Sequence, residues 1–177
     1  GSIQTVVTKP IPRRSVVLGK FIGHAVAVAV FVSIMVGLAA GLVRGVSGYA
    51  PPNLVIPSTL LILEGWVILA LSYAVGSVTG TLANGLVVFM LYGLALVGSW
   101  IERIGSLSGN VSAQYLGIAA SLVMPTEAIW QRAAFESMPG IVRNTVGLVS
   151  PFTAANPPSG LMIAYAAAYA AVLVAVA

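Results

Sequence analysis

A phosphate-binding loop is the first chemistry to test, because Gly19-Lys20 is a Gly-Lys pair of the kind that such loops contain. The loop also needs a glycine five residues before Gly19 and a Ser or Thr after the lysine. The chain has Arg14 and Phe21 at these positions, so we exclude a phosphate loop. We expect that this chain is not an ATPase, that it binds no cofactor, and that any ATP used with it is hydrolysed on another chain.

A serine nucleophile is the second possibility, because Gly45-Val46-Ser47-Gly48 resembles the serine motif of intramembrane proteases. The single histidine, His24, would have to act as the base, and a base must come within hydrogen-bond reach of its nucleophile. On one continuous helix, the 23 residues between them correspond to about 35 Å. We therefore exclude this dyad and expect Gly45–Gly48 to form a flexible outer turn.

Glu64 is the third candidate, an acid within an otherwise apolar run. Such acids are costly in a bilayer and usually face a cavity or a partner. Glu64 could have a functional role, in which it lines a translocation path or relays protons. It could instead have a structural role, in which its carboxyl group makes a hydrogen bond or stays hydrated near the interface. We expect no metal site, because the chain has no Cys or Asp, one His and four Glu.

The composition indicates an integral membrane protein, since 59% of the 177 residues are hydrophobic and 7% are charged, against about 25% charged in soluble domains. The sequence predicts an all-α, polytopic helical membrane protein that forms a single transmembrane domain. Nucleic acid is not expected as a partner, because half of the cations lie in the first twenty residues. Apolar runs of roughly the length needed to cross a bilayer predict about four spans, at 15–43, 58–79, 83–100 and 161–177.

The distribution of Lys and Arg predicts the orientation. Residues 1–14 carry cations and no acid and are placed in the cytoplasm, under a plasma (bacterial inner) membrane, with His24 at the inner interface. Residues 101–160 are then extracytoplasmic, with a re-entrant or interfacial piece at 110–124, ended by Pro125. A helix at 126–137 is expected at headgroup depth, with its apolar side and Trp130 at the interface. The glycines at 37, 41 and 45 are expected to pack helices within the chain rather than to form a dimer seam.

The opening segment predicts a short amphipathic helix that lies on the membrane surface. Ile3, Val6 and Val7 share one helical side, and Pro10 prevents the helix from continuing. Ser15 is expected to cap the helix that enters the membrane. The cations Lys9, Arg13 and Arg14 either pair with acidic residues of a partner protein or bind anionic lipid heads.

The run GSIQTVVTKPIPRRSVVLGK resembles the signature of type-two ATP-binding-cassette (ABC) exporter permeases, which lies in the cytoplasm before the third of six spans. The resemblance covers essentially the whole chain, but only these first twenty residues are specific. Leu122-Val123-Met124-Pro125 is further similar to the permease of the nitrous-oxide-reductase maturation type. The two earlier spans of the family do not precede Gly1, and we expect this sequence to be part of a longer, six-span chain.

The resemblance implies an ABC ATPase subunit that binds ATP and magnesium, a second permease copy that forms a homodimer with this one and shares its pathway, and a lipid bilayer around both. It also implies an ATPase-coupling segment, formed by Ile3, Gln4, Val6, Val7, Thr8, Lys9, Pro10, Arg13 and Arg14. Two other functions stay open on the residues alone. An ATP-independent secondary transporter or channel would use charges or broken helices at mid-membrane, for which Glu64 is the candidate. A membrane scaffold or assembly subunit would need neither an ATPase partner nor a charged site at mid-membrane.

Overall fold

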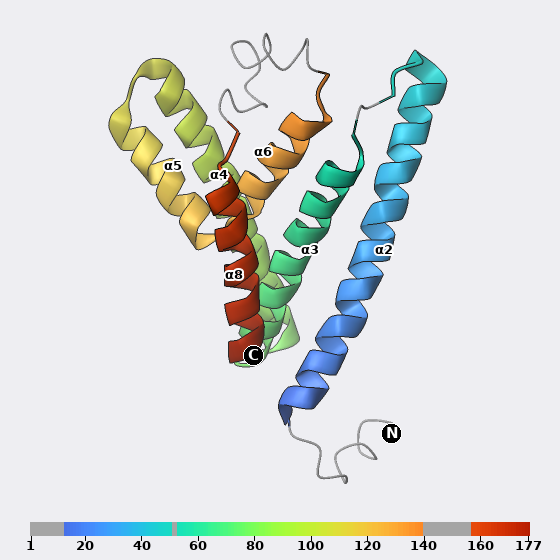
Figure 1. Cartoon of the computed structure of the whole chain (residues 1–177). Coiled ribbons are helices and arrows are strands. Elements are labelled where there is room, and N and C mark those ends of the chain that lie inside the picture. The colour runs from blue at the N-terminus through green and yellow to red at the C-terminus, as the bar shows by residue number, and fades with distance from the viewer. Residues whose placement is uncertain (1–12, 51–52, 140–156) are drawn as a thin grey trace.

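The computed structural model describes residues 13–50, 53–139 and 157–177, and within them it contains helices and no strand. This confirms the predicted all-α, polytopic helical fold (Figure 1). The six helices are α2 (Arg13–Ser47), α3 (Val55–Gly76), α4 (Thr81–Ser108), α5 (Val111–Val123), α6 (Thr126–Ser137) and α8 (Gly160–Val176).

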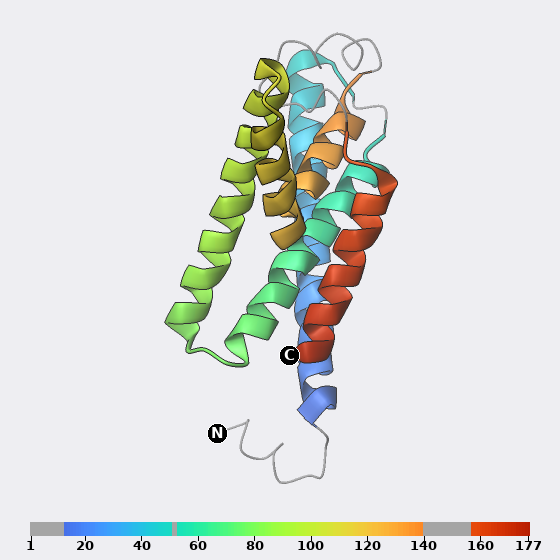
Figure 2. The same cartoon turned by 90° about the vertical axis from the view of Figure 1, so that its left-hand side faces the viewer.

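Three of these helices, α2, α3 and α4, are long and apolar enough to cross a membrane, and α8 is a shorter apolar helix of 17 residues. Figures 1 and 2 show that the start of α2, the α3–α4 connection and the end of α8 lie toward one end of the bundle. The end of α2 and the α4–α5 turn lie toward the other end. How these helices are placed in a bilayer stays a prediction.

Helix α2 is longer at both ends than its predicted span. It begins at Arg13, so Ser15 lies inside the helix, and the predicted capping role of Ser15 is wrong. It continues through Ser47 and stops at Gly48, whose φ of 68° is the left-handed conformation that glycine adopts easily at a helix end. Three of the four residues expected to form a flexible turn are therefore helical.

Helices α4 and α5 form a tightly packed hairpin. Gly109 turns the chain with a φ of 69°, and the side chain of Asn110 accepts a hydrogen bond from the backbone nitrogen of Ala113, which caps α5. Glycines then allow the two backbones to approach. A methyl group on Gly117 would overlap the side chain of Glu102 and lie 2.7 Å from the carbonyl oxygen of Gly98.

We expect Gly117→Ala to lower the free energy of unfolding by about 1–3 kcal/mol, because the added methyl group meets backbone atoms that cannot rotate away. Thermal or denaturant unfolding in detergent micelles measures the change. Gly93→Ala in α4 is the matched control, since nothing lies within 4 Å of the added carbon, and it should stabilise by up to about 1 kcal/mol through helix propensity. Equal effects of the two substitutions would contradict the close packing of this hairpin.

A sharp turn at Met124-Pro125 separates α5 from α6 and lies part-way along the bundle (Figures 1 and 2). Met124 is fully buried. The last carbonyl groups of α5 have no partner within their own helix, and α8 supplies two: the hydroxyl of Tyr165 donates to Leu122 O at 2.6 Å and that of Tyr169 to Val123 O at 3.0 Å. This turn is thus held inside the bundle by hydrogen bonds from α8.

Helix α6 occupies the predicted residues, and its apolar side is partly covered by other helices, while Trp130 on that side is 37% exposed. Ile129 is fully buried and Ala133 nearly so. Both belong to a core that also includes residues of α3 and α8, namely Leu60, Val67, Ala70, Ala166 and Ala170. Part of the predicted apolar side therefore packs against neighbouring helices, and the depth of α6 in a bilayer stays a prediction.

The expected packing role of the evenly spaced glycines in α2 is also not found among the described residues. A carbon added at Gly37, Gly41 or Gly45 would meet no atom within 4 Å. Helix α2 instead contacts α3 at Gly65, where an added carbon would lie 2.6 Å from Val28 Cγ1, and through the indole of Trp66, which donates to Ala25 O at 3.0 Å.

Candidate functional site

Glu64 lies in the middle of α3. It is nine residues from the start of the helix at Val55, about two and a half turns, rather than the one and a half turns expected from a span beginning at 58. Its residue is 8% exposed, which disfavours a carboxyl kept wet near the interface. The choice between a path-lining group and a structural one stays open.

A second carboxyl, Glu127 in the first turn of α6, reaches the same region from another helix. Glu64 and Glu127 are close enough to influence each other electrostatically, and both act on Tyr92 of α4. Two neighbouring carboxylates repel each other when both are ionised. The tertiary structure thus brings Glu64, which the sequence singles out, near Glu127 of α6.

Glu127 is held by polar groups of α4 and α6. Ser99 Oγ donates to Glu127 Oε1 at 3.0 Å and accepts from Gln131 Nε2 at 2.9 Å. Arg103 Nη2 lies 3.3 Å from the same Glu127 oxygen. We call these four residues the Glu127 cluster.

The Glu127 cluster is built from two pairs of residues four positions apart, one on each of two facing helices. Ser99 and Arg103 lie on one face of α4, and Glu127 and Gln131 lie on one face of α6, because residues at this spacing are neighbours on a helix surface. Ser99 is fully buried, and the side chains of Arg103 and Glu127 are about 12% and 10% exposed. The cluster ties α6 to α4 in a region with little solvent.

The electrostatics of the Glu127 cluster are a balance of burial and pairing. Burial raises the pKa of the Glu127 carboxyl above its ordinary value, while the hydrogen bond from Ser99, the charge of Arg103 and the hydrogen bond from Gln131 act in the opposite direction. The start of α6 adds a favourable partial positive charge. The neighbouring hydroxyl of Thr126 is fully buried and has no hydrogen-bond partner among the described residues.

Sequence reasoning did not identify the Glu127 cluster, although a signal was present. Arg103 and Glu127 are opposite charges in a segment whose net charge is zero, and each has a polar residue four positions away on the same helical face. The partners are 24 to 32 residues apart along the chain. Nothing in a periodic pattern indicates which two faces meet.

The predicted coupling segment is mostly beyond what the structure describes. Arg13 and Arg14 are the first two residues of α2. The other coupling residues lie outside the described residues: Ile3, Gln4, Val6, Val7, Thr8, Lys9 and Pro10.

His24 connects α2 to α3 near the start of α2. Its Nδ1 lies 2.7 Å from Lys20 O and 3.0 Å from the hydroxyl of Tyr73, and the two rings meet edge to face. His24 and Ser47 belong to the same uninterrupted helix, which confirms that they cannot form a catalytic dyad within one chain.

The family model described as "ABC-2 family transporter protein" matches residues 1–177, the full length of the chain. The chain belongs to the ABC-2 transporter family. Comparison with curated proteins and with solved structures gave no match.

Membership of the ABC-2 family confirms the coarser part of the resemblance found in the opening residues. The protein is a membrane-integral, non-catalytic permease component of an ABC transporter, a family that implies an ABC ATPase partner in general. This favours an ABC permease over the ATP-independent transporter and the scaffold. The match does not extend to the nitrous-oxide-reductase maturation type.

Proposed function

We propose that this ABC-2 protein is the permease subunit of an exporter in the plasma membrane, driven by a separate ATPase that binds residues 1–14 on the cytoplasmic side. Two copies of the permease form the pathway, and ATP and magnesium are bound by the ATPase.

The observation that carries the proposal is the continuity of α2. It begins at Arg13, inside the coupling motif, and runs for 35 residues without a break, a length of about 52 Å. A helix without a hinge transmits a displacement of its first turn along its whole length. An ATPase that moves the coupling segment would therefore tilt all of α2.

The contacts of α2 give this movement a route into the rest of the bundle. Helix α2 touches α3 through Trp66, Tyr73 and the close approach at Gly65. Helix α3 carries Glu64 and packs against α6 through the core around Ile129. ATP would change this arrangement only through its differential affinity for the two states of the complex.

The test is a triple variant of the coupling segment, Ile3→Asp with Val7→Asp and Arg13→Glu. It removes the apolar side and reverses one charge, so we expect at least a tenfold loss, equivalent to about 1.4 kcal/mol of binding free energy, in copurification with the ATPase and in permease-stimulated ATP hydrolysis. The control is Arg44→Glu with Val46→Asp, which makes the same kinds of change at the other end of α2, where Val46 is exposed. Wild-type association and stimulation in the triple variant would count decisively against the proposal.

A further inference from the structure

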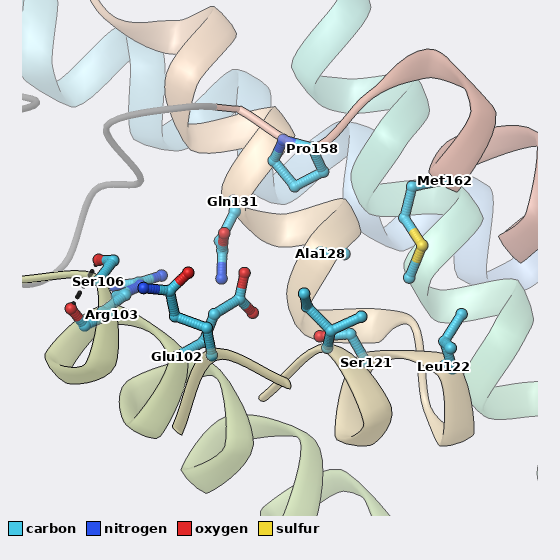
Figure 3. A pocket seen from close by; sticks show the side chains of 11 residues that line it. Glu102, Arg103, Ser106, Ser121, Leu122, Ala128, Gln131, Pro158 and Met162 are labelled. Carbon is cyan, nitrogen blue, oxygen red and sulfur yellow. Dashed lines mark hydrogen bonds between the residues drawn. The ribbon is translucent and has the colours of Figure 1, made fainter. Parts of the chain in front are cut away.

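A pocket of about 380 Å³ lies between the α4–α5 hairpin and the helices α6 and α8. This is near the lower end of the range for small-molecule sites, roughly 300–1,000 Å³. Figure 3 shows that its polar and apolar groups are segregated. Glu102, Arg103, Ser106 and Gln131 gather on one side, while Leu122 and Met162 lie on the other.

The polar side of this pocket holds one cation, Arg103, beside two carboxylates, Glu102 in the lining and Glu127 next to it. Arg103 is bound to Glu127, outside the pocket lining. Glu102 is half-buried and lines the pocket; the charge of Arg103 acts on it, but no salt bridge among the described side chains includes it. Gln114, Gln131 and Ser121 add uncharged polar groups that can accept hydrogen bonds.

These features indicate which kind of ligand the pocket could bind. A carboxylate beside amide and hydroxyl oxygens favours a group that is positively charged and donates hydrogen bonds, since charge-assisted hydrogen bonds are roughly twice as strong as neutral ones. An anion of the same shape would be repelled by Glu102. The side chains of Ile118, Leu122 and Met162 offer an apolar wall for a short hydrocarbon part.

We propose that this pocket binds a primary ammonium compound with a short apolar chain, the ammonium at Glu102 and the chain against Leu122 and Met162. The ammonium comes either from a free alkylamine or from the ethanolamine headgroup of a lipid. The site is separate from the proposed ATPase contact, so binding is measured without nucleotide and can fail while the proposed coupling holds.

The experiment compares three probes of equal chain length, hexylammonium, hexanol and hexanoate, by isothermal titration calorimetry on the full chain in phosphatidylcholine nanodiscs, with the heats of empty nanodiscs subtracted. We expect hexylammonium to bind at least tenfold more tightly than hexanol, with hexanoate weakest. Glu102→Gln keeps the size of the side chain and should remove this preference. Equal binding of hexylammonium and hexanol to the unmodified protein would overturn the proposal.

Two further comparisons test the location and the source of the ammonium. Leu122→Trp fills the pocket and should weaken hexylammonium at least tenfold, whereas Leu116→Trp, on the same helix but exposed and outside the lining, should not. Unchanged binding in Leu122→Trp would contradict the location. With phosphatidylethanolamine in the nanodiscs, a weaker apparent affinity for hexylammonium identifies the lipid headgroup as the source, and an unchanged affinity identifies a free amine; either result supports the ammonium site.

Discussion

Glu127→Leu is expected to lower the free energy of unfolding by about 3–5 kcal/mol, because it deprives a buried Arg103 of the carboxylate with which it pairs. It also removes the acceptor for the hydroxyl of Ser99. Unfolding by denaturant in detergent micelles, followed by tryptophan fluorescence, measures the loss. Glu127→Gln should be milder, because its amide oxygen can still accept the hydrogen bond from Ser99.

Two controls separate the buried pair from a general effect of removing a charge. The double variant Arg103→Leu with Glu127→Leu should recover much of the loss, since removing both members of a buried pair is often close to neutral. Glu136→Leu removes the carboxylate from the more exposed pair between Arg132 and Glu136, which are four residues apart in α6, and should cost about 0.3–0.5 kcal/mol. A double variant as unstable as Glu127→Leu, or equal losses at Glu127 and Glu136, would show that the pair does not hold α6.

Ile129→Ala is the second large effect, with an expected loss of about 2–5 kcal/mol. Ile129 is fully buried where α6 meets α3 and α8, so its truncation leaves a cavity that the neighbouring helices can fill only in part. The same unfolding measurement applies. Because this residue belongs to the proposed route from α2 to α6, permease-stimulated ATP hydrolysis should fall as well.

Ile104→Ala is the matched control for Ile129→Ala. It makes the same change in α4, where the side chain is 63% exposed and leaves no cavity inside the bundle. We expect a change below about 0.5 kcal/mol, as for surface substitutions away from special features. If the two isoleucines respond alike, α6 is not packed as the structure describes.

The two predictions concern interactions whose existence only the tertiary structure reveals. The apolar side of α6 was recognised from its periodicity, but the periodicity did not show that α3 and α8 cover Ile129 and Ala133. Periodicity identifies an apolar side without saying what covers it. In a membrane protein this ambiguity is acute, because lipid tails are as apolar as a protein interior.

The glycines also show that a pattern within one helix does not identify the surface that this helix contacts. Spacing of four along one helix drew attention to Gly37, Gly41 and Gly45, where an added carbon would meet no atom within 4 Å, while Gly98 and Gly117 make the close approach between α4 and α5. A close approach depends on two facing surfaces. One helix supplies only half of that information, so the spacing within it cannot identify the contact.

The sequence by itself determined the membrane class, the all-α fold, the residues of α6 and the resemblance to ABC permeases, which the family match confirms in its coarser part. Hydropathy and sequence motifs are properties of contiguous residues, so these features can be recognised from short stretches of the sequence. The tertiary structure alone decided that Glu127, Ser99, Arg103 and Gln131 form one cluster near Glu64, and that Glu102 lines a pocket. These groups come from different helices. They are brought together by the packing of whole helix faces against one another, and no pattern within a single segment specifies that packing.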